Sequence, residues 1–206
     1  DRLGIRSIRL TGGEPTLRAG LPDLVARLAR LDVDLSLTTN GTTLDRLAAP
    51  LVAAGLRRVN VSLDTLRRDR FEDITRRDDL DRVLAGIDAA LAVGLDPVKL
   101  NAVVMRGVND DEVVDLARFG RERGVAVRFI EFMPLDASGR WDRDAVVSQD
   151  EIVAAVDAAF PLEPPRRGSA PATVWRYRDG RGEVGVVPSV TRAFCDDCDR
   201  VRLTAD

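Results

Sequence analysis

The residues best suited to chemistry near the start of this chain are Gly12, Gly13 and Glu14, which follow the apolar run Ser7–Leu10 and precede Pro15. A glycine pair permits backbone torsions and close approaches that a Cβ would block, so such a turn can place bare backbone against a ligand. The proline prevents a strand from continuing through the turn. A lone Gly-Gly turn is most often only a strand end, so the later strands must decide between the two interpretations.

Cys195 and Cys198 form a second group with chemical potential, a Cys-x-x-Cys pair. Such a pair can be a redox dithiol, half of a zinc site or half of an iron–sulfur site. A redox dithiol normally opens a helix, whereas this pair precedes the strand-like run Val201–Leu203, which disfavours the dithiol. Zinc needs four ligands, and the chain has two cysteines and no histidine. Any metal site built on this pair is therefore incomplete within these residues.

The composition excludes several classes of function. With 206 residues, 45% hydrophobic and 32% charged, the chain is predicted to fold around one sizeable core, and its net charge of −3 gives no general attraction to nucleic acid. Aromatic residues make up only 4%, which argues against base-stacking surfaces. The absence of histidine excludes Ser-His-Asp and Cys-His machinery, so an enzyme here would depend on a cofactor.

No membrane contact is expected. The chain has no apolar run that approaches the roughly 20 residues of a membrane span, and no basic and apolar leader follows Asp1. These two features predict a cytoplasmic protein.

Short strand-like runs alternate with amphipathic helical segments, which is typical of βα units and a parallel sheet. We expect strands at Ser7–Leu10, Leu35–Thr38, Arg58–Leu63, Val98–Val104 and Val127–Phe132. Helices are expected at Leu21–Leu31, Leu44–Ala54, Leu80–Val93 and Glu112–Arg123. For the last of these, Asn109 is the predicted N-cap and Glu112 completes a capping box.

The regular alternation ends at Met133-Pro134. Beyond it we expect a helix opened by Ser148 and two short strands near Val174–Tyr177 and Glu183–Val187. The predicted domains are therefore a βα core over residues 1–134 and an irregular α+β appendage over residues 135–206.

The two faces of the expected strands are chemically sorted, because successive side chains point to opposite faces. Polar side chains on alternate positions are Arg9, Thr11, Ser36, Thr38, Asn40, Asn60, Ser62, Asp64, Lys99 and Asn101. The positions between them are almost all aliphatic. A closed eight-stranded barrel packs its interior with branched apolar side chains, so this pattern predicts an open or wide βα barrel lined for a polar ligand.

Two points on this sheet need separate treatment. An antiparallel sheet with one wet face is disfavoured, because a helix separates each pair of strands. On the fifth strand, Arg128 and Met133 have opposite parity, so a bulge is expected if both side chains reach the cavity.

Six segments together resemble the GTP 3′,8-cyclases of molybdenum cofactor biosynthesis, a family of the radical S-adenosylmethionine (SAM) superfamily. They are Arg9–Pro15, Leu37–Gly41, Asn60–Asp64, Val98–Asn101, Arg128–Met133 and Phe194–Arg202. The Gly-Gly-Glu-Pro sequence alone indicates the superfamily, whereas the lysine strand and the Cys-x-x-Cys-x-Arg-x-Arg ending indicate this activity. The resemblance implies a partial, open TIM-like βα barrel of the radical SAM type and an enzyme of the lyase class.

The resemblance also implies roles for individual residues. SAM would contact Gly12, Gly13, Glu14, Ser62 and Met133, with Glu14 receiving its ammonium group. GTP would contact Arg9, Thr38, Lys99, Arg200 and Arg202, with the triphosphate against Arg9 and Lys99. Cys195 and Cys198 would bind a second [4Fe–4S] cluster with a third cysteine beyond Asp206. Arg128 stays open between a phosphate contact and a salt bridge.

In the reaction that the resemblance implies, a reduced cluster cleaves SAM to methionine and a 5′-deoxyadenosyl radical, which takes hydrogen from the ribose C3′ of GTP. The product is 3′,8-cyclo-7,8-dihydro-GTP, which a cyclic pyranopterin monophosphate synthase would receive. The family's Cys-x-x-x-Cys-x-x-Cys loop does not precede Gly12, so we expect an internal fragment that is inactive by itself. Ser7 stands where some relatives carry a phosphate-directed lysine.

Two other interpretations stay open. One is a different radical SAM enzyme with an auxiliary iron–sulfur cluster, such as a peptide-modifying enzyme, which would lack affinity for GTP. The other is a noncatalytic nucleotide-binding barrel that has lost the first cluster. The sequence does not determine the oligomeric state and leaves a homodimer open.

Overall fold

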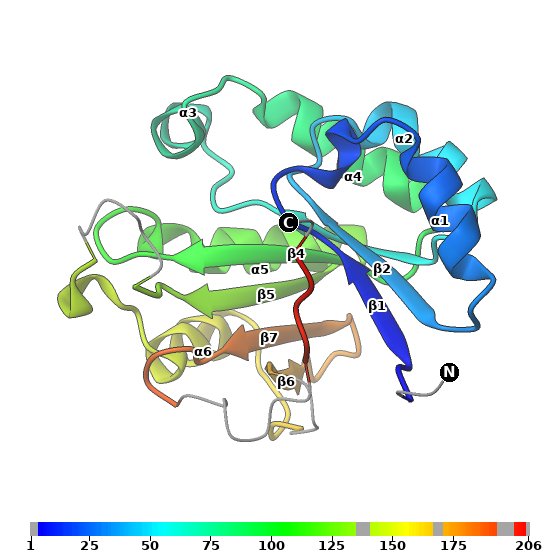
Figure 1. Ribbon diagram of the computed structural model, residues 1–206. Coiled ribbons are helices and arrows are strands. Elements are labelled where there is room, and N and C mark those ends of the chain that lie inside the picture. The colour runs from blue at the N-terminus through cyan, green and yellow to red at the C-terminus, as the bar shows by residue number, and fades with distance from the viewer. Residues whose placement is uncertain (1–3, 135–140, 167–170, 193–199, 205–206) are drawn as a thin grey trace. The chain divides into compact units, whose positions relative to one another are not determined.

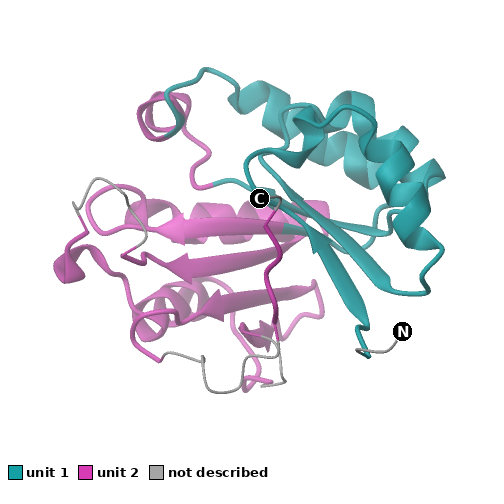
Figure 2. Ribbon diagram, viewed as in Figure 1, with its two compact units in different colours: residues 1–63, 75–99 teal, residues 64–74, 100–206 magenta. Residues whose placement is uncertain are grey.

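The computed structural model describes residues 4–134, 141–166, 171–192 and 200–204 and divides into two compact units (Figures 1 and 2). Unit 1 comprises residues 1–63 and 75–99, and unit 2 comprises residues 64–74 and 100–206. The division into a barrel core over residues 1–134 and an appendage over residues 135–206 stays a prediction. No helix among the described residues is long and apolar enough to cross a membrane.

Unit 1 is built from parallel βα repeats. Its strands β1 (Ser7–Leu10), β2 (Asp34–Thr39) and β3 (Arg58–Ser62) pair in parallel in that order. Its helices, which lie beside these strands in Figure 1, are η1 (Pro15–Leu17), α1 (Leu21–Ala29), α2 (Leu44–Ala53) and α4 (Leu80–Ala92). The strand β4 (Val98–Val104) begins in this unit, where the amide of Val59 donates to the carbonyl of Pro97 at 3.3 Å.

The core of unit 1 is aliphatic. It holds the helices against the loops that follow the strands. The fully buried side chains include Leu37 on β2, Val61 on β3 and Ile87 on α4. A Cβ built on Gly86 of α4 would lie 2.3 Å from the carbonyl oxygen of Gly41, so α4 rests directly on the loop that follows β2. Burial of each large aliphatic side chain contributes about 1.5–3 kcal/mol.

Unit 2 contains the rest of β4 and most of α3 (Arg68–Thr75). Its other elements are η2 (Asp110–Glu112), α5 (Val113–Arg123), β5 (Ala126–Glu131), η3 (Arg143–Ala145), α6 (Gln149–Ala159), β6 (Thr173–Arg176) and β7 (Glu183–Val187). The strand order is β4-β5-β7-β6, with β7 parallel to β5 and β6 antiparallel to β7. The chain beyond residue 134 therefore adds strands beside β5, with α5 packed against β5 and α6 packed against β7.

An arginine between two aromatic rings ties the end of α6 to β6 in unit 2. The guanidinium of Arg121 lies 4.5 Å from the ring centroid of Phe160 and 4.2 Å from that of Tyr177. Its Nη2 also donates to a carboxylate oxygen of Asp179 at 2.6 Å. Burial raises the pKa of Tyr177 to about 12, although the nearby Arg121 acts in the opposite direction.

Most of the predicted elements are present, and β1, β4 and β7 have the predicted bounds. The helix α3 was not predicted, because its charged sequence buries only Phe71 and so lacks an apolar stripe. The strand β5 ends at Glu131, so Met133 lies beyond it and strand alternation does not fix the direction of its side chain.

The predicted capping box of Asn109 and Glu112 is wrong. The short helix η2 covers Asp110–Glu112, and α5 begins only at Val113. The side chain of Asn109 makes no capping hydrogen bond there. Both side chains instead bond to residues far away in the sequence, as described below.

Candidate ligand-binding site

The strand β1 ends in an open glycine turn. Gly12 has φ 90° and Gly13 has φ 43°, in the region of backbone space that favours glycine. Both residues are exposed, and a Cβ built on either would meet no atom within 4 Å. The turn therefore leaves room beside its backbone, which is what the sequence predicted for a ligand contact.

Glu14 ties this turn to the carboxyl end of β2. Its Oε1 accepts hydrogen bonds from the amide of Thr16 at 3.0 Å, the hydroxyl of Thr16 at 2.7 Å and the hydroxyl of Thr39 at 2.7 Å. From the described residues, its Oε2 accepts one bond, from the amide of Asn40 at 2.7 Å. Oε2 is therefore the less occupied of the two oxygens and can accept a further donor. Glu14 is thus a structural link that keeps an acceptor position for a ligand.

The strand register places the predicted polar residues on one face of unit 1. Arg9 lies opposite Ser36, and Thr38 lies opposite Asn60. Partners in parallel strands point to the same side of a sheet, and the Nδ2 of Asn60 donates to the Oγ1 of Thr38 at 3.3 Å. Ser62 follows on this face at the end of β3 and is exposed, as is Arg9.

Lys99 obeys the same alternation on β4. It is half-buried, while its neighbours Val98 and Leu100 are buried on the opposite side of the strand. The sorted faces that the sequence predicted are therefore present along β4 as well.

Contacts within the protein fill the amino end of this polar face. Arg58, which is aligned with Ser36, forms an ion pair with Asp34. The hydroxyl of Ser36 donates to the carbonyl of Ile8 at 3.4 Å, and Ser36 is buried. Arg58 and Asp34 were not among the predicted site residues, although their parity would have placed them here. Asn40 and Ser62, at the carboxyl ends of β2 and β3, are exposed, as expected for a ligand site of this fold.

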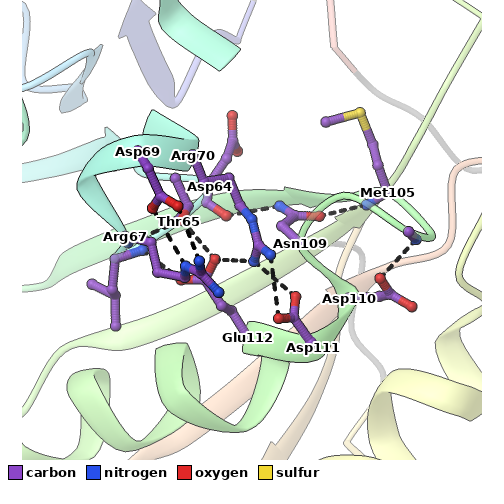
Figure 3. Close-up of polar contacts among 12 residues, drawn as sticks. Asp64, Thr65, Arg67, Asp69, Arg70, Met105, Asn109, Asp110, Asp111 and Glu112 are labelled. Carbon is purple, nitrogen blue, oxygen red and sulfur yellow. Dashed lines mark hydrogen bonds and ion pairs between the residues drawn. The ribbon is translucent and has the colours of Figure 1, made fainter. Parts of the chain in front are cut away.

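After β3 the chain enters unit 2, where a buried asparagine fixes it (Figure 3). Asn109 donates from Nδ2 to the carbonyls of Asp64 at 2.7 Å and Val103 at 2.8 Å. Its Oδ1 accepts the amide of Met105 at 2.7 Å. Asp64 accepts the amide of Val103 at 2.8 Å, and burial raises the pKa of the Asp64 carboxyl despite this bond.

A buried glutamate makes the second link in the same loop (Figure 3). Glu112 accepts the hydroxyl of Thr65 at 2.6 Å and the amide of Leu66 at 2.8 Å. Arg70 pairs with Glu112 and also donates to Asp111 at 2.7 Å. The sequence could not predict these links, because Glu112 and Thr65 lie 47 residues apart.

The predicted ligand-binding residues of unit 2 do not share one face of a sheet as those of unit 1 do. Met133 is half-buried beyond the end of β5, and Arg200 and Arg202 are exposed in a segment without regular secondary structure. Arg128 lies opposite Gly185, where a Cβ would come within 3.4 Å of the Arg128 Cγ. The glycine therefore leaves room for the stem of the arginine.

The cysteine pair cannot be placed in this way, because Cys195 and Cys198 lie outside the described residues. Within the described part of the chain, no group of three or more His, Cys, Asp and Glu side chains is arranged to hold a metal ion. The iron–sulfur role of the two cysteines stays a prediction.

Glu131, at the end of β5, is a wholly buried carboxylate that the sequence analysis did not single out. Its Oε1 accepts the amide of Gln149 at 2.9 Å and the hydroxyl of Thr191 at 2.5 Å. Its Oε2 accepts the amides of Val190 and Thr191, both at 2.8 Å. The available signal was a carboxylate in an apolar strand, which requires partners if it is buried.

Comparison with known families identifies the fold. Residues 1–120 match the Radical SAM superfamily, and residues 125–206 match the family described as Molybdenum Cofactor Synthesis C. The chain belongs to the radical SAM superfamily. Membership of this superfamily implies the use of SAM and of a [4Fe–4S] cluster.

Two curated relatives are similar over nearly the whole chain. The GTP 3′,8-cyclase of Acidothermus cellulolyticus is 55% identical over 209 residues, which cover 99% of this chain and 58% of that protein. The GTP 3′,8-cyclase of Corynebacterium glutamicum (strain R) is 49% identical over 218 residues, which cover 100% of this chain and 58% of that protein. The chain thus spans 58% of the length of both relatives.

Two solved structures share the fold. Coproporphyrinogen III oxidase (HemN) from Escherichia coli, described as a radical SAM enzyme, matches with a TM-score of 0.55 and 15% identity, over 74% of this chain and 39% of that chain. An archaeal TYW1 matches with a TM-score of 0.58 and 16% identity, over 85% of this chain and 55% of that chain. These matches confirm the predicted fold class, a partial, open TIM-like βα barrel of the radical SAM type.

Proposed function

We propose that this protein is a GTP 3′,8-cyclase, a lyase that converts GTP to 3′,8-cyclo-7,8-dihydro-GTP in molybdenum cofactor biosynthesis. The observation that carries the proposal is the agreement between two matches. Relatives of that name align with 99% and 100% of the chain at 55% and 49% identity, and residues 125–206 match Molybdenum Cofactor Synthesis C. Superfamily membership alone would not select GTP as the substrate.

The residues of unit 1 fit the methionine end of SAM, which together with a reduced [4Fe–4S] cluster would supply the radical chemistry. The turn at Gly12 and Gly13 has open space beside exposed backbone. The Oε2 of Glu14 accepts one hydrogen bond, from Asn40, and so can accept one from an ammonium group. Ser62 and Met133 are the further contacts in this proposal.

Arg9, Thr38 and Lys99 are the proposed GTP contacts of unit 1. The Thr38 hydroxyl accepts from Asn60 and therefore keeps its own hydrogen for an acceptor on the substrate. A hydrogen bond between a charged group and phosphate contributes about 1.5–3 kcal/mol, and the arginine fork matches two phosphate oxygens. The role of these residues is to hold the substrate in place and to exclude water from a reactive intermediate.

The appendage completes the proposal. Arg200 and Arg202, both exposed, would contact the nucleotide. Cys195 and Cys198 would be ligands of an auxiliary [4Fe–4S] cluster, as the resemblance to the GTP 3′,8-cyclases implies. A cytoplasmic location, transfer of the product to a cyclic pyranopterin monophosphate synthase and a homodimer are further parts of the proposal.

The decisive experiment uses the full-length gene product, reconstituted with iron and sulfide without oxygen. We expect 5′-deoxyadenosine to form from SAM only when GTP is present. SAM cleavage that ignores GTP would favour a different radical SAM enzyme, such as a peptide-modifying one. GTP binding without any SAM cleavage would favour a noncatalytic nucleotide-binding barrel.

The assignment of Lys99 has its own test. In the full-length protein, Lys99→Ala should weaken GTP binding about 10- to 100-fold, because one charge-assisted contact is lost, and should leave SAM binding unchanged. Both affinities can be measured by isothermal titration calorimetry. The matched control is Arg57→Ala, because Arg57 is exposed and lies just before β3 on the parity of the aliphatic face. Equal losses of GTP and SAM affinity in Lys99→Ala would contradict the assignment.

A further inference from the structure

Glu131 joins three parts of unit 2 that are distant in the sequence. It is the last residue of β5, and one of its donors is the amide of Gln149, the first residue of α6. Its other three bonds come from Val190 and Thr191, which follow β7 and lie 59 and 60 residues away. We call these four residues the Glu131 anchor.

The anchor requires a carboxylate. Glu131 is 0% exposed, so its carboxylate depends on partners within the protein. Its charge is compensated by three backbone amides, one hydroxyl and the amino end of α6, where a helix favours negative charge. All four acceptor positions of the carboxylate are used. A neutral side chain would leave donors of the anchor, among them the buried amide of Gln149, without acceptors.

The anchor lies close in sequence to two groups of proposed functional residues. Thr191 precedes Cys195 by four residues, and Glu131 precedes Met133 by two residues. We infer that Glu131 is a positioning residue for the proposed auxiliary cluster, because it fixes the chain at Val190 and Thr191, four residues before Cys195. This inference rests on the proposed function, which assigns an auxiliary [4Fe–4S] cluster to the cysteines.

The test replaces Glu131 with glutamine in the full-length protein. Glutamine has the same shape, but its NH₂ group would face amide donors in place of an acceptor oxygen. By hydrogen exchange and mass spectrometry, we expect the amides of Val190 and Thr191 to exchange at least about tenfold faster, while peptides of unit 1 stay unchanged.

The second readout is the cluster iron. Partners outside the ligand set typically change metal affinity by about 10- to 100-fold, so Glu131→Gln should lose auxiliary iron to a chelator about tenfold faster than the wild type. A variant carrying both Cys195→Ser and Cys198→Ser gives the signal without that cluster. Faster exchange at Val190 and Thr191 with unchanged iron release would overturn the inference.

Matched variants separate positioning from general destabilisation. Glu112→Gln disrupts another buried carboxylate of unit 2, which bonds Thr65 and Leu66 and not the anchor, so it should change neither readout. Equal iron loss in Glu112→Gln would overturn the inference.

Two milder variants, both at Thr191, test the anchor if the Glu131→Gln protein does not fold. Thr191→Val removes only the hydroxyl donor and should speed iron release several-fold, whereas Thr191→Ser keeps the hydroxyl and should match the wild type. Identical behaviour of the two Thr191 variants would contradict the anchor. If the wild-type protein holds no second cluster, the proposed function fails and the positioning role fails with it, whereas the exchange of Val190 and Thr191 still reports whether the anchor exists.

Discussion

Glu14 in unit 1 and Glu131 in unit 2 are carboxylates that each accept four hydrogen bonds, but they divide these bonds differently. Glu131 accepts two bonds on each oxygen and is wholly buried. Glu14 accepts three bonds on Oε1 and one on Oε2, is only partly buried and adjoins an exposed glycine turn.

The difference separates a structural carboxylate from one that can also bind a ligand. A carboxylate with every acceptor position used by its own chain can only hold that chain together. One with an unused position beside open space can add a ligand at little cost in structure. Hydrogen-bond capacity, counted oxygen by oxygen, therefore distinguishes the two roles where residue type does not.

The largest expected effect comes from exchanging the two glutamates for glutamine. Glu131→Gln should lower the free energy of opening of β5 by about 3 kcal/mol or more, because a wholly buried carboxylate site loses matched acceptors. Glu14→Gln should lower that of β2 by only about 1–2 kcal/mol, yet weaken SAM binding in the full-length protein. Hydrogen exchange measures the free energy of opening of both strands. Equal decreases for β5 and β2 would contradict the difference between Glu131 and Glu14.

The glycine turn offers a sharper test of the ligand side of the comparison. Gly12→Ala should cost about 1 kcal/mol of stability through backbone strain alone, because its Cβ would meet no protein atom. The added methyl group would occupy the space proposed for SAM and should weaken SAM binding about tenfold. Gly94→Ala is the control, since Gly94 has φ 81° and equally open surroundings at the end of α4. Similar SAM affinities in the two variants would place the ligand elsewhere.

Asp64 is a third carboxylate and should behave in the opposite way to Glu131. Burial raises its pKa above 3.8, so its charged form destabilises the native state. Asp64→Asn keeps an oxygen for the Val103 amide and should raise the free energy of unfolding near neutral pH by about 1 kcal/mol or less. The gain should disappear below pH 3.8, where the carboxyl is protonated in both states. A loss of stability at pH 7 would show that the charge itself is needed.

The smallest effect concerns the amino end of α6, where the side chains of Ser148 and Glu151 each accept the other residue's backbone amide in a capping box. Hydrogen bonds from Ser148, together with the Arg106 guanidinium, lower the pKa of Glu151 to about 2. Its ionised form therefore stabilises the native state above its ordinary pKa of 4.5, and this contribution is lost as the pH falls toward 2. Because Arg106 and Glu151 are 44% and 49% exposed, we expect at most about 1 kcal/mol. Glu151→Gln should be less stable than the wild type at pH 6 and equal to it near pH 2, as measured by urea unfolding.

The sequence predicted those parts of the fold that depend on local pattern. Strand alternation located β4, because every second side chain of this strand is buried in the apolar core. The prediction failed at Asn109 and Glu112, where a local capping pattern competed with other partners. Asn109 satisfies three backbone groups in unit 2, one of them 45 residues away, and a helix cap would have satisfied one. Which partner a polar side chain selects depends on the tertiary structure.

The candidate site shows the same limit. The glycine turn at Gly12 and Gly13 and the half-buried Lys99 were predictable from residue type and parity, which are local properties. The hydroxyl of Thr39, which holds Glu14, lies 25 residues away and on the opposite parity from the predicted ligand residue Thr38. The Glu131 anchor depends on residues after β7 and so could not be found from the strand that carries it.

The arginine-stacked ring of Tyr177 has a practical consequence for the chain. Tyr177 is its only tyrosine, and both tryptophans, Trp141 and Trp175, belong to unit 2 as well. Intrinsic fluorescence of the chain therefore originates entirely in that unit. A fluorescence melting curve therefore follows the surroundings of these three rings in unit 2 and has no tyrosine or tryptophan reporter in unit 1, where the glycine turn lies.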